Sequence, residues 1–313
     1  MQVLIADKTA SVCEKILKNE NHSVDVITGL SPGELKKIIK KYHGIVIRSA
    51  TKLTADIIAA AENLKVIGRA GTGVDNIDVA AASKRNIVVM NTPGGNSNAV
   101  AELAFAQMIN LSRDLYNAVL TLKSNRWEKK RFKGHEIAGK TLGLLGYGRI
   151  SRLISERALS FGMNVLCFDP KIHKNIIDEN GIKLIASLAA LLPAADFISL
   201  HLSKRADTIN FIDEKAFAQM KPGVYFINYA RGGIVNEGAL LDALNREIVA
   251  GAAIDVYEAE PPIDFQLINH PKVICTPHIG AASVESQERV AKMIAEQFVD
   301  MFAGKPVRNA VYA

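Results

Sequence analysis

Apolar β-rich runs alternate with helical patterns along nearly the whole of this 313-residue chain. Strands that are separated by helices favour parallel sheets, with helices covering both faces. The predicted strands of the first part lie at residues 3–6, 24–27, 44–47, 65–68 and 87–90. Those of the second part lie at residues 141–145, 164–168, 182–185, 196–200, 224–228, 251–254 and 272–276. The alternation therefore predicts an α/β protein with two sheets.

A change of composition separates the two series of strands. The stretch NTPGGNSN at 91–98 is rich in glycine, asparagine and proline, as linkers are. One long helix is expected over 97–117, and a last helix over 283–303 should return to the first domain. We therefore expect one domain formed by residues 1–95 and 283–313, with residues 96–282 inserted as a second domain.

The composition argues against several classes of protein. Hydrophobic residues make up 49% and charged residues 22%, and no apolar run is long enough for a membrane helix. The net charge is +6, but no nucleic-acid-binding pattern accompanies the longest basic run, residues 129–131. We expect neither a membrane nor a nucleic acid as partner, and the positive charge favours a small anion as ligand.

The cysteines and the N-terminus point to a reducing compartment. Cys13, Cys167 and Cys275 lie far apart and outside any metal-binding spacing, which argues against a disulfide framework and a metal site. The start MQVLIADKTA has no signal-peptide pattern and is typical of a first strand. The expected location is the cytoplasm.

The stretch GLLGYGRISR at 143–152 differs from the fingerprint G-x-G-x-x-G by Ser151 at the third glycine. It joins a predicted strand to a helix, and the helix N-terminus suits a pyrophosphate. Asp169 ends the next strand, 23 positions after Gly146, where an acid binds the ribose of NAD and repels the 2′-phosphate of NADP. Ser151 is interpreted as a tolerated packing variant. The predicted NAD contacts here are Gly146, Tyr147, Gly148, Arg149, Ile150 and Asp169.

Polar side chains follow the last three predicted strands. These side chains are Arg231, Asp255, Glu260 and His278. Ligands of open α/β sheets bind beyond the carboxyl ends of the strands. There His278 can take the hydroxyl proton of a 2-hydroxy acid while Glu260 orients the imidazole ring. Arg231 can bind the carboxylate of the acid through two parallel N–H donors. The alternative is structural, with Glu260 as a loop acid and His278 as a structural histidine.

Six motifs together resemble the D-isomer-specific 2-hydroxyacid dehydrogenases. They are RAGTGVDNID (69–78), NTPGGNSNAVAELAFAQM (91–108), GKTLGLLGYGRI (139–150), NYARGGIVNEGAL (228–240), GAAIDVYEAEPP (251–262) and TPHIGA (276–281). The resemblance implies a flavodoxin-like substrate domain made from both termini, an inserted Rossmann-type NAD-binding domain, and a cleft between them. It also implies an NAD-dependent dehydrogenase that forms a homodimer.

The resemblance also assigns roles to residues. It implies that Arg231, Glu260 and His278 are catalytic, with His278 as the acid/base, and that Asp255 binds the nicotinamide carboxamide. Further implied cofactor contacts are His201, Tyr229, Ala230, Arg231, His278 and Gly280. The loop Ala70, Gly71, Thr72 and Gly73 is implied to offer backbone N–H groups to the substrate carboxylate, with further substrate contacts from Arg231 and His278.

Some positions depart from the usual family pattern. HLSKRADT at 201–208 replaces a more proline-rich run, and Tyr229 replaces a smaller residue and is expected to crowd the nicotinamide face. The sequence ends at 313, whereas longer members continue into a C-terminal regulatory domain, so no feedback through such a domain is expected.

Cations after the third and fourth strands favour a phosphorylated 2-hydroxy acid as substrate. They are Arg48, Lys52 and Arg69. Residues 129–131, beside Trp127, either reach a neighbouring subunit's site or face solvent. The excess of apolar positions in 97–117 also suggests a homodimer. The alternatives are a reductase of hydroxypyruvate or glyoxylate and, from another class, an NAD-sensing corepressor-like binding protein.

Overall fold

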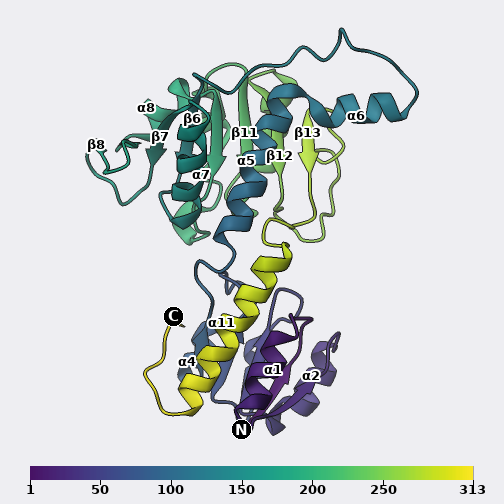
Figure 1. The fold of residues 1–313 in the computed structure, drawn as a ribbon, viewed down its shortest axis with the longest axis vertical. Helices are drawn as coiled ribbons and strands as arrows, with labels where there is room; N and C mark the ends of the chain where they lie inside the picture. The colour runs from purple at the N-terminus through teal and green to yellow at the C-terminus, as the bar shows by residue number, and fades with distance from the viewer. Residues whose placement is uncertain (313) are drawn as a thin grey trace. The chain divides into compact units, whose positions relative to one another are not determined.

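The computed structural model describes residues 1–312, and the chain divides into two compact units (Figure 1). Unit 1 consists of Met1–Asn96 and the chain from Ala281 onward, and unit 2 is Ser97–Gly280. The domain limits expected from the sequence lie within two residues of these boundaries.

Unit 1 is built on a mostly parallel sheet of order β14-β5-β4-β3-β1-β2, in which only β14 runs antiparallel to its neighbour β5. The parallel strands follow the order 2-1-3-4-5, which is that of flavodoxin-like folds. The strands are β1 (Gln2–Ile5), β2 (Ser23–Val26), β3 (Gly44–Ile47), β4 (Val66–Arg69), β5 (Val88–Met90) and β14 (Ala310–Val311). The helices are α1 (Val12–Asn19), α2 (Pro32–Ile38), α3 (Ala55–Ala59), α4 (Val79–Lys84) and α11 (Val284–Phe302).

The last helix returns to unit 1, as predicted, because the sheet has room for it. α11 packs beside α1, and Phe298 of α11 is fully buried against the sheet (Figure 1). A Cβ atom on Gly44 or Gly68 would lie 2.7 Å or 2.3 Å from the Phe298 ring. Only glycine therefore leaves the space that this ring occupies on two neighbouring strands.

Unit 2 contains a sheet of order β13-β12-β11-β10-β6-β7-β9-β8, parallel except for β8. Counted from β6, the order reverses between β6 and β10, as in Rossmann folds. The strands are β6 (Thr141–Leu145), β7 (Asn164–Phe168), β8 (Ile176–Ile177), β9 (Lys183–Leu184), β10 (Phe197–Leu200), β11 (Val224–Asn228), β12 (Val249–Ile254) and β13 (Val273–Cys275). The helices are α5 (Ser97–Arg113), α6 (Leu115–Lys123), α7 (Arg149–Ser160), α8 (Leu188–Leu191), α9 (Glu214–Ala218) and α10 (Glu237–Asn245).

The expected single helix over 97–117 is wrong, because the chain breaks at Asp114. This residue has a left-handed backbone with φ of +48°, a conformation that Asp and Asn adopt more readily than most residues. The side chain of Asn110 accepts the backbone N–H of Tyr116 at 3.0 Å and so stabilises the break. α5 and α6 are therefore separate helices, and a long loop leads from α6 to β6 (Figure 1).

The buried face of α7 is only partly apolar. Ser151, Ile154, Ser155 and Ala158 are buried, whereas Phe161, at the C-cap, is 51% exposed. Small polar residues thus form part of the face that packs on the sheet. Among the helices of residues 1–312, none is long and apolar enough to cross a membrane.

Candidate active site

Three adjacent strands bring the polar residues of the second domain to one edge of the sheet. β11, β12 and β13 are neighbours and parallel, so the segments that follow them leave the same edge. Gly232, in the loop after β11, lies against the backbone of Tyr257 after β12. A Cβ atom on Gly232 would fall 1.6 Å from the carbonyl oxygen of Tyr257. Glycine is therefore required for the Arg231 loop to approach the segment that leads to Glu260.

His278 and Glu260 form a hydrogen-bonded pair. Nδ1 of His278 lies 2.7 Å from Oε2 of Glu260, and the side chains are 43% and 38% exposed. Burial raises the pKa of Glu260, but the His278 hydrogen bond and charge, the Tyr257 N–H and the Arg231 charge outweigh it and lower the pKa. Within residues 1–312, Nε2 of His278 has no hydrogen-bond partner. The imidazole is thus held at one nitrogen and open at the other.

Asp255 anchors the turn that carries His278. Its carboxylate is 2% exposed and accepts hydrogen bonds from Thr276 Oγ1 at 2.6 Å, Ile279 N at 2.8 Å and Gly280 N at 2.7 Å. His278 has a left-handed backbone with φ of +52°, which costs energy for a non-glycine residue and has to be held by its surroundings. These bonds hold it. A contact of Asp255 with the nicotinamide carboxamide stays a prediction.

Tyr229 lies inside the fold beside this turn. It is 4% exposed, and its hydroxyl lies 3.2 Å from Thr276 Oγ1. The interior of unit 2 therefore accommodates much of the bulk that was expected to crowd the nicotinamide face. Its neighbour Ala230 is 8% exposed.

The glycine-rich turn has the geometry of a pyrophosphate site. Gly146 has φ of +101°, and a Cβ atom on it would lie 2.8 Å from the carbonyl oxygen of His201. Gly148 is the N-cap of α7, receives no side-chain cap, and has open space beside its Cα atom. Within the described chain, the N–H groups of Arg149 and Ile150 make no hydrogen bond. These donors at a helix N-terminus fit an anionic group of a cofactor.

Ser151 has a role that the sequence did not reveal. It is fully buried, and its Oγ donates a hydrogen bond to the carbonyl oxygen of Gly146 at 2.5 Å. The serine therefore ties the first turn of α7 to the glycine-rich loop.

Two further cofactor candidates follow β7 and β10, the strands on either side of β6. Asp169, after β7, accepts the N–H of Tyr147 at 2.9 Å and that of Lys171 at 3.0 Å. His201 follows β10, and burial lowers the pKa of its imidazole to about 3, which keeps it neutral. Its Nε2 lies 2.8 Å from Ser199 Oγ, and its buried Nδ1 has no partner within residues 1–312. An orphaned buried nitrogen is consistent with a position beside a ligand.

In unit 1, the loop that carries Arg48 and Lys52 is fixed from both sides. The buried carboxylate of Asp7 accepts the N–H of Arg48 at 2.6 Å, and the N–H and hydroxyl of Thr51 at 3.2 Å and 2.7 Å. The amide of Asn76 donates to the carbonyl oxygens of Arg48 and Thr51 at 2.8 Å and 2.6 Å. Sequence reasoning missed Asp7, although an acid directly after the first strand was a usable signal.

The loop after β4 offers fewer backbone donors than expected. The N–H of Ala70 bonds to Ile47 O at 2.9 Å, and that of Gly71 bonds to Arg69 O at 2.8 Å. No hydrogen bond in the described residues uses the N–H groups of Thr72 and Gly73. Gly71 has φ of +153°, a backbone conformation that residues with a side chain rarely adopt, so glycine is favoured there. Thr72 and Gly73 are thus the donors left for a ligand.

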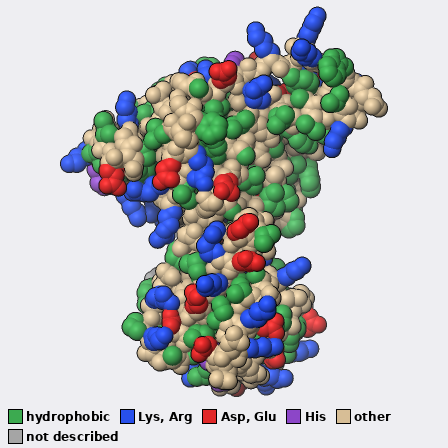
Figure 2. All heavy atoms as spheres, in the orientation of Figure 1, with side chains coloured by type: hydrophobic (Ala, Val, Ile, Leu, Met, Phe, Trp, Pro, Cys, Tyr) green, Lys and Arg blue, Asp and Glu red, His purple; other side chains and the backbone are tan. Residues whose placement is uncertain are grey.

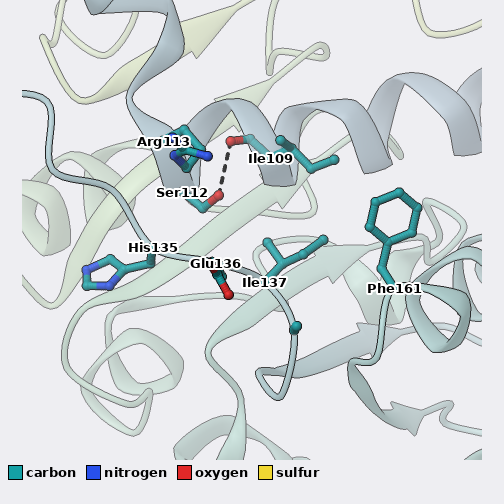
Figure 3. Close-up of a pocket in the computed structure, with 8 residues that line it drawn as sticks. Ile109, Ser112, Arg113, His135, Glu136, Ile137 and Phe161 are labelled. Carbon is teal, nitrogen blue, oxygen red and sulfur yellow. Dashed lines mark hydrogen bonds between the residues drawn. The ribbon is translucent and has the colours of Figure 1, made fainter.

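A cavity of about 230 Å³ lies elsewhere in unit 2, near the amino end of β6 (Figure 3). It is lined by Ile109, Ser112, Arg113, His135, Glu136, Ile137, Ala138 and Phe161. The ring of His135 points away from the other labelled side chains (Figure 3). No predicted site residue lines this cavity. In residues 1–312, no group of three or more His, Cys, Asp or Glu side chains could hold a metal ion.

Comparison with known families agrees with this geometry. Residues 105–280 match the model of the D-isomer specific 2-hydroxyacid dehydrogenase, NAD binding domain. The chain belongs to this family. NAD is therefore the cofactor of unit 2, and the uncapped start of α7 and Asp169 are the groups that suit it.

Members of the dehydrogenase family with known names match nearly the whole chain. D-3-phosphoglycerate dehydrogenase from Homo sapiens is 45% identical over 312 residues, covering 100% of this chain and 58% of the relative. The enzyme of the same name from Archaeoglobus fulgidus is 44% identical, covering 99% and 59%. The chain thus spans less than two thirds of the length of these relatives.

A solved structure is similar to the whole chain as well. The NAD-dependent formate dehydrogenase from Staphylococcus aureus in complex with NAD has a TM-score of 0.88 at 28% identity, covering 100% of this chain and 99% of that one.

Proposed function

We propose that this chain oxidises D-3-phosphoglycerate to 3-phosphohydroxypyruvate with NAD, the first step of the phosphorylated route to serine. The observation that carries the proposal is the His278–Glu260 pair at 2.7 Å, at the sheet edge that also presents the Arg231 loop. The relatives named D-3-phosphoglycerate dehydrogenase, at 42–45% identity, support this choice of substrate.

His278 is the acid/base of the proposed reaction. The start of α7 and Asp169 would hold NAD, which would supply the acceptor for the hydride from C2 of the substrate. His278 takes the proton of the C2 hydroxyl at Nε2, because Nδ1 is engaged by Glu260. The Glu260 carboxylate stabilises the imidazolium that results, as its lowered pKa keeps it ionised. Arg231 supplies paired N–H donors for the substrate carboxylate.

The phosphate group is assigned to the cations of unit 1. Arg48 and Arg69 follow adjacent parallel strands, β3 and β4, and Lys52 belongs to the loop that Asp7 and Asn76 fix. The guanidinium groups of arginine match the geometry of phosphate oxygens. The N–H groups of Thr72 and Gly73 are assigned to the substrate carboxylate, to which Arg231 is assigned as well.

A panel of substrates tests the proposal. We expect kcat/KM for 3-phosphoglycerate and 3-phosphohydroxypyruvate to exceed that for hydroxypyruvate and glyoxylate, and NAD(H) to be preferred over NADP(H). A preference for the unphosphorylated acids would indicate a hydroxypyruvate or glyoxylate reductase. Binding of NADH without turnover of any 2-oxo acid would indicate a corepressor-like binding protein.

The surface of α6 supports a homodimer. Its exposed hydrophobic side chains, with that of Trp127 beyond it, are Leu115, Tyr116, Val119, Leu120, Leu122 and Trp127. Figure 2 shows hydrophobic and basic side chains together at this end of unit 2. An exposed apolar patch of this kind marks an interaction surface. We assign it to a second copy of the chain, the partner that the family resemblance implies.

The cytoplasm remains the proposed location. Cys13, Cys167 and Cys275 are free thiols, and the first two are buried in the cores of the units. Free thiols fit a reducing compartment.

A further inference from the structure

The segment after β7 carries an acid that the sequence did not single out. Asp178 follows β8, and its Oδ1 accepts the N–H groups of Asn180 and Ile182, both at 2.9 Å. Its Oδ2 accepts a hydrogen bond from the hydroxyl of Tyr147. One oxygen of Asp178 therefore closes its own turn, while the other reaches the glycine-rich loop.

Tyr147 is held at both of its ends. Its backbone N–H donates to Asp169 Oδ2 at 2.9 Å, and its hydroxyl donates to Asp178. The guanidinium carbon of Arg152 lies 4.3 Å from the centre of its ring, within the range of cation–π contacts. Burial and the carboxylate of Asp178 raise the pKa of Tyr147, so the hydroxyl stays protonated and remains a donor.

The position of Tyr147 sets the position of the groups that suit NAD. It lies between Gly146 and Gly148, and Gly148 begins α7, whose first N–H groups are uncapped. The same residue orients the carboxylate of Asp169, which suits the ribose. A side chain that fixes Tyr147 therefore fixes both the anion-binding and the ribose-binding groups before the cofactor arrives.

We propose that Asp178 is a positioning residue for NAD, which acts through its hydrogen bond to the Tyr147 hydroxyl. The bond holds the Gly146–Gly148 turn and Asp169 in the arrangement that binds the adenosine half of the cofactor. This inference rests on the NAD-binding domain and is independent of the identity of the 2-hydroxy acid.

Three variants of the full chain test the hydrogen bond: Tyr147→Phe, Asp178→Asn and the double variant. Tyr147→Phe keeps the ring over which Arg152 lies and removes only the hydroxyl. Each single variant should raise the Kd for NADH about three- to tenfold, the range for one lost hydrogen bond. Fluorescence titration measures this Kd. The double variant should bind no more weakly than the weaker single variant, because both disrupt the same charge-assisted bond between the hydroxyl and the carboxylate.

The adjacent acid provides a matched control. Glu179 is exposed in the same turn and carries the same charge as Asp178. Loss of a negative charge near an anionic cofactor should by itself strengthen binding or leave it unchanged. Glu179→Gln should therefore not raise the Kd for NADH. If Asp178→Asn weakens NADH binding, the loss of negative charge cannot be the cause, because that loss alone would favour the anionic cofactor.

Binding of AMP and of nicotinamide mononucleotide shows which half of the cofactor the variants affect. Binding of AMP should weaken by the same factor as binding of NADH, whereas binding of nicotinamide mononucleotide should not change. An unchanged Kd for NADH in Tyr147→Phe would overturn the proposal, even if Tm fell, because the bond would then be structural only. Losses that add in the double variant would overturn it as well. Should Asp178→Asn fail to fold, the Tyr147→Phe result decides alone.

Discussion

The Nδ1 atom of His278 lies 2.7 Å from Oε2 of Glu260, although the two residues follow different strands of the sheet. The pairing is possible because β12 and β13 are adjacent and parallel. Asp255, below the turn, holds the left-handed backbone of His278 through the N–H groups of Ile279 and Gly280. The geometry of the proposed catalytic pair thus depends on a third residue, which is a buried acid.

Replacing His278 by alanine should slow proton transfer strongly without preventing the binding of NADH. A positioned acid/base contributes about 10²- to 10⁴-fold, so kcat should fall by about that factor. The Kd for NADH should change little, because the glycine-rich turn lies at another strand end. Steady-state kinetics and NADH titration check this. If NADH binding is lost together with activity, His278 is structural.

Replacing Arg48 by alanine should affect phosphorylated substrates selectively. Loss of a charge-assisted contact should raise KM for 3-phosphoglycerate about 10- to 100-fold and leave KM for hydroxypyruvate nearly unchanged. Lys36→Ala is the control, since Lys36 is an exposed cation of the same unit that pairs with Asp56 at 2.6 Å. Equal effects of Arg48→Ala on both substrates would remove the phosphate assignment.

Ser151 should matter for stability more than for the cofactor. Ser151→Ala leaves the buried carbonyl of Gly146 with only the weak thiol donor of Cys167, at 3.6 Å, which should lower the free energy of unfolding by about 1 kcal/mol. Ser151→Gly should cost about 1 kcal/mol more, because glycine disfavours a helix. KM for NADH should change little in both variants. Thermal unfolding and NADH kinetics test this, and a large improvement in KM with glycine would contradict it.

His201 should make the protein sensitive to acid. Its pKa is about 3 when folded, against about 6.5 for a free imidazole, so below pH 6.5 the unfolded chain binds an extra proton. The free energy of unfolding should therefore fall as the pH drops from 6.5 towards 3, by about 1 kcal/mol per pH unit from this group. His201→Gln should flatten that dependence in urea unfolding at pH 4.5–7. Parallel curves for both proteins would disprove the assignment.

The exposed face of α6 should hold two copies of the chain together. Leu120 and Leu122 are 43% and 58% exposed, and a charge placed there should oppose burial in an interface. Leu120→Asp combined with Leu122→Asp should convert a dimer to a monomer in sedimentation or light scattering. Leu159→Asp is the control, because Leu159 is 39% exposed on a different helix. If the unmodified chain is itself a monomer in these measurements, the proposed dimer is excluded.

Much of the fold could be predicted because its signals are local. Gly44–Ile47, Thr141–Leu145, Asn164–Phe168 and Val224–Asn228 are strands with the predicted limits, since each is a short apolar run between breaking residues. Ser31 and Glu34 form the capping box that their spacing suggests. The helix break at Asp114 was missed, because it depends on a left-handed backbone that a side chain of the previous helix supports.

The sequence alone determined which residues reach the carboxyl edge of the sheet of unit 2. Parallel strands all end on one side, so Gly146, Asp169, Arg231 and His278 were found from their places after apolar runs. The tertiary structure alone decided what holds them. The bonds of Asp255 to the His278 turn, of Ser151 to Gly146 and of Asp178 to Tyr147 join residues whose pairing no local pattern specifies. Hydrogen bonds are directional and short, so only the folded backbone sets which donors and acceptors meet.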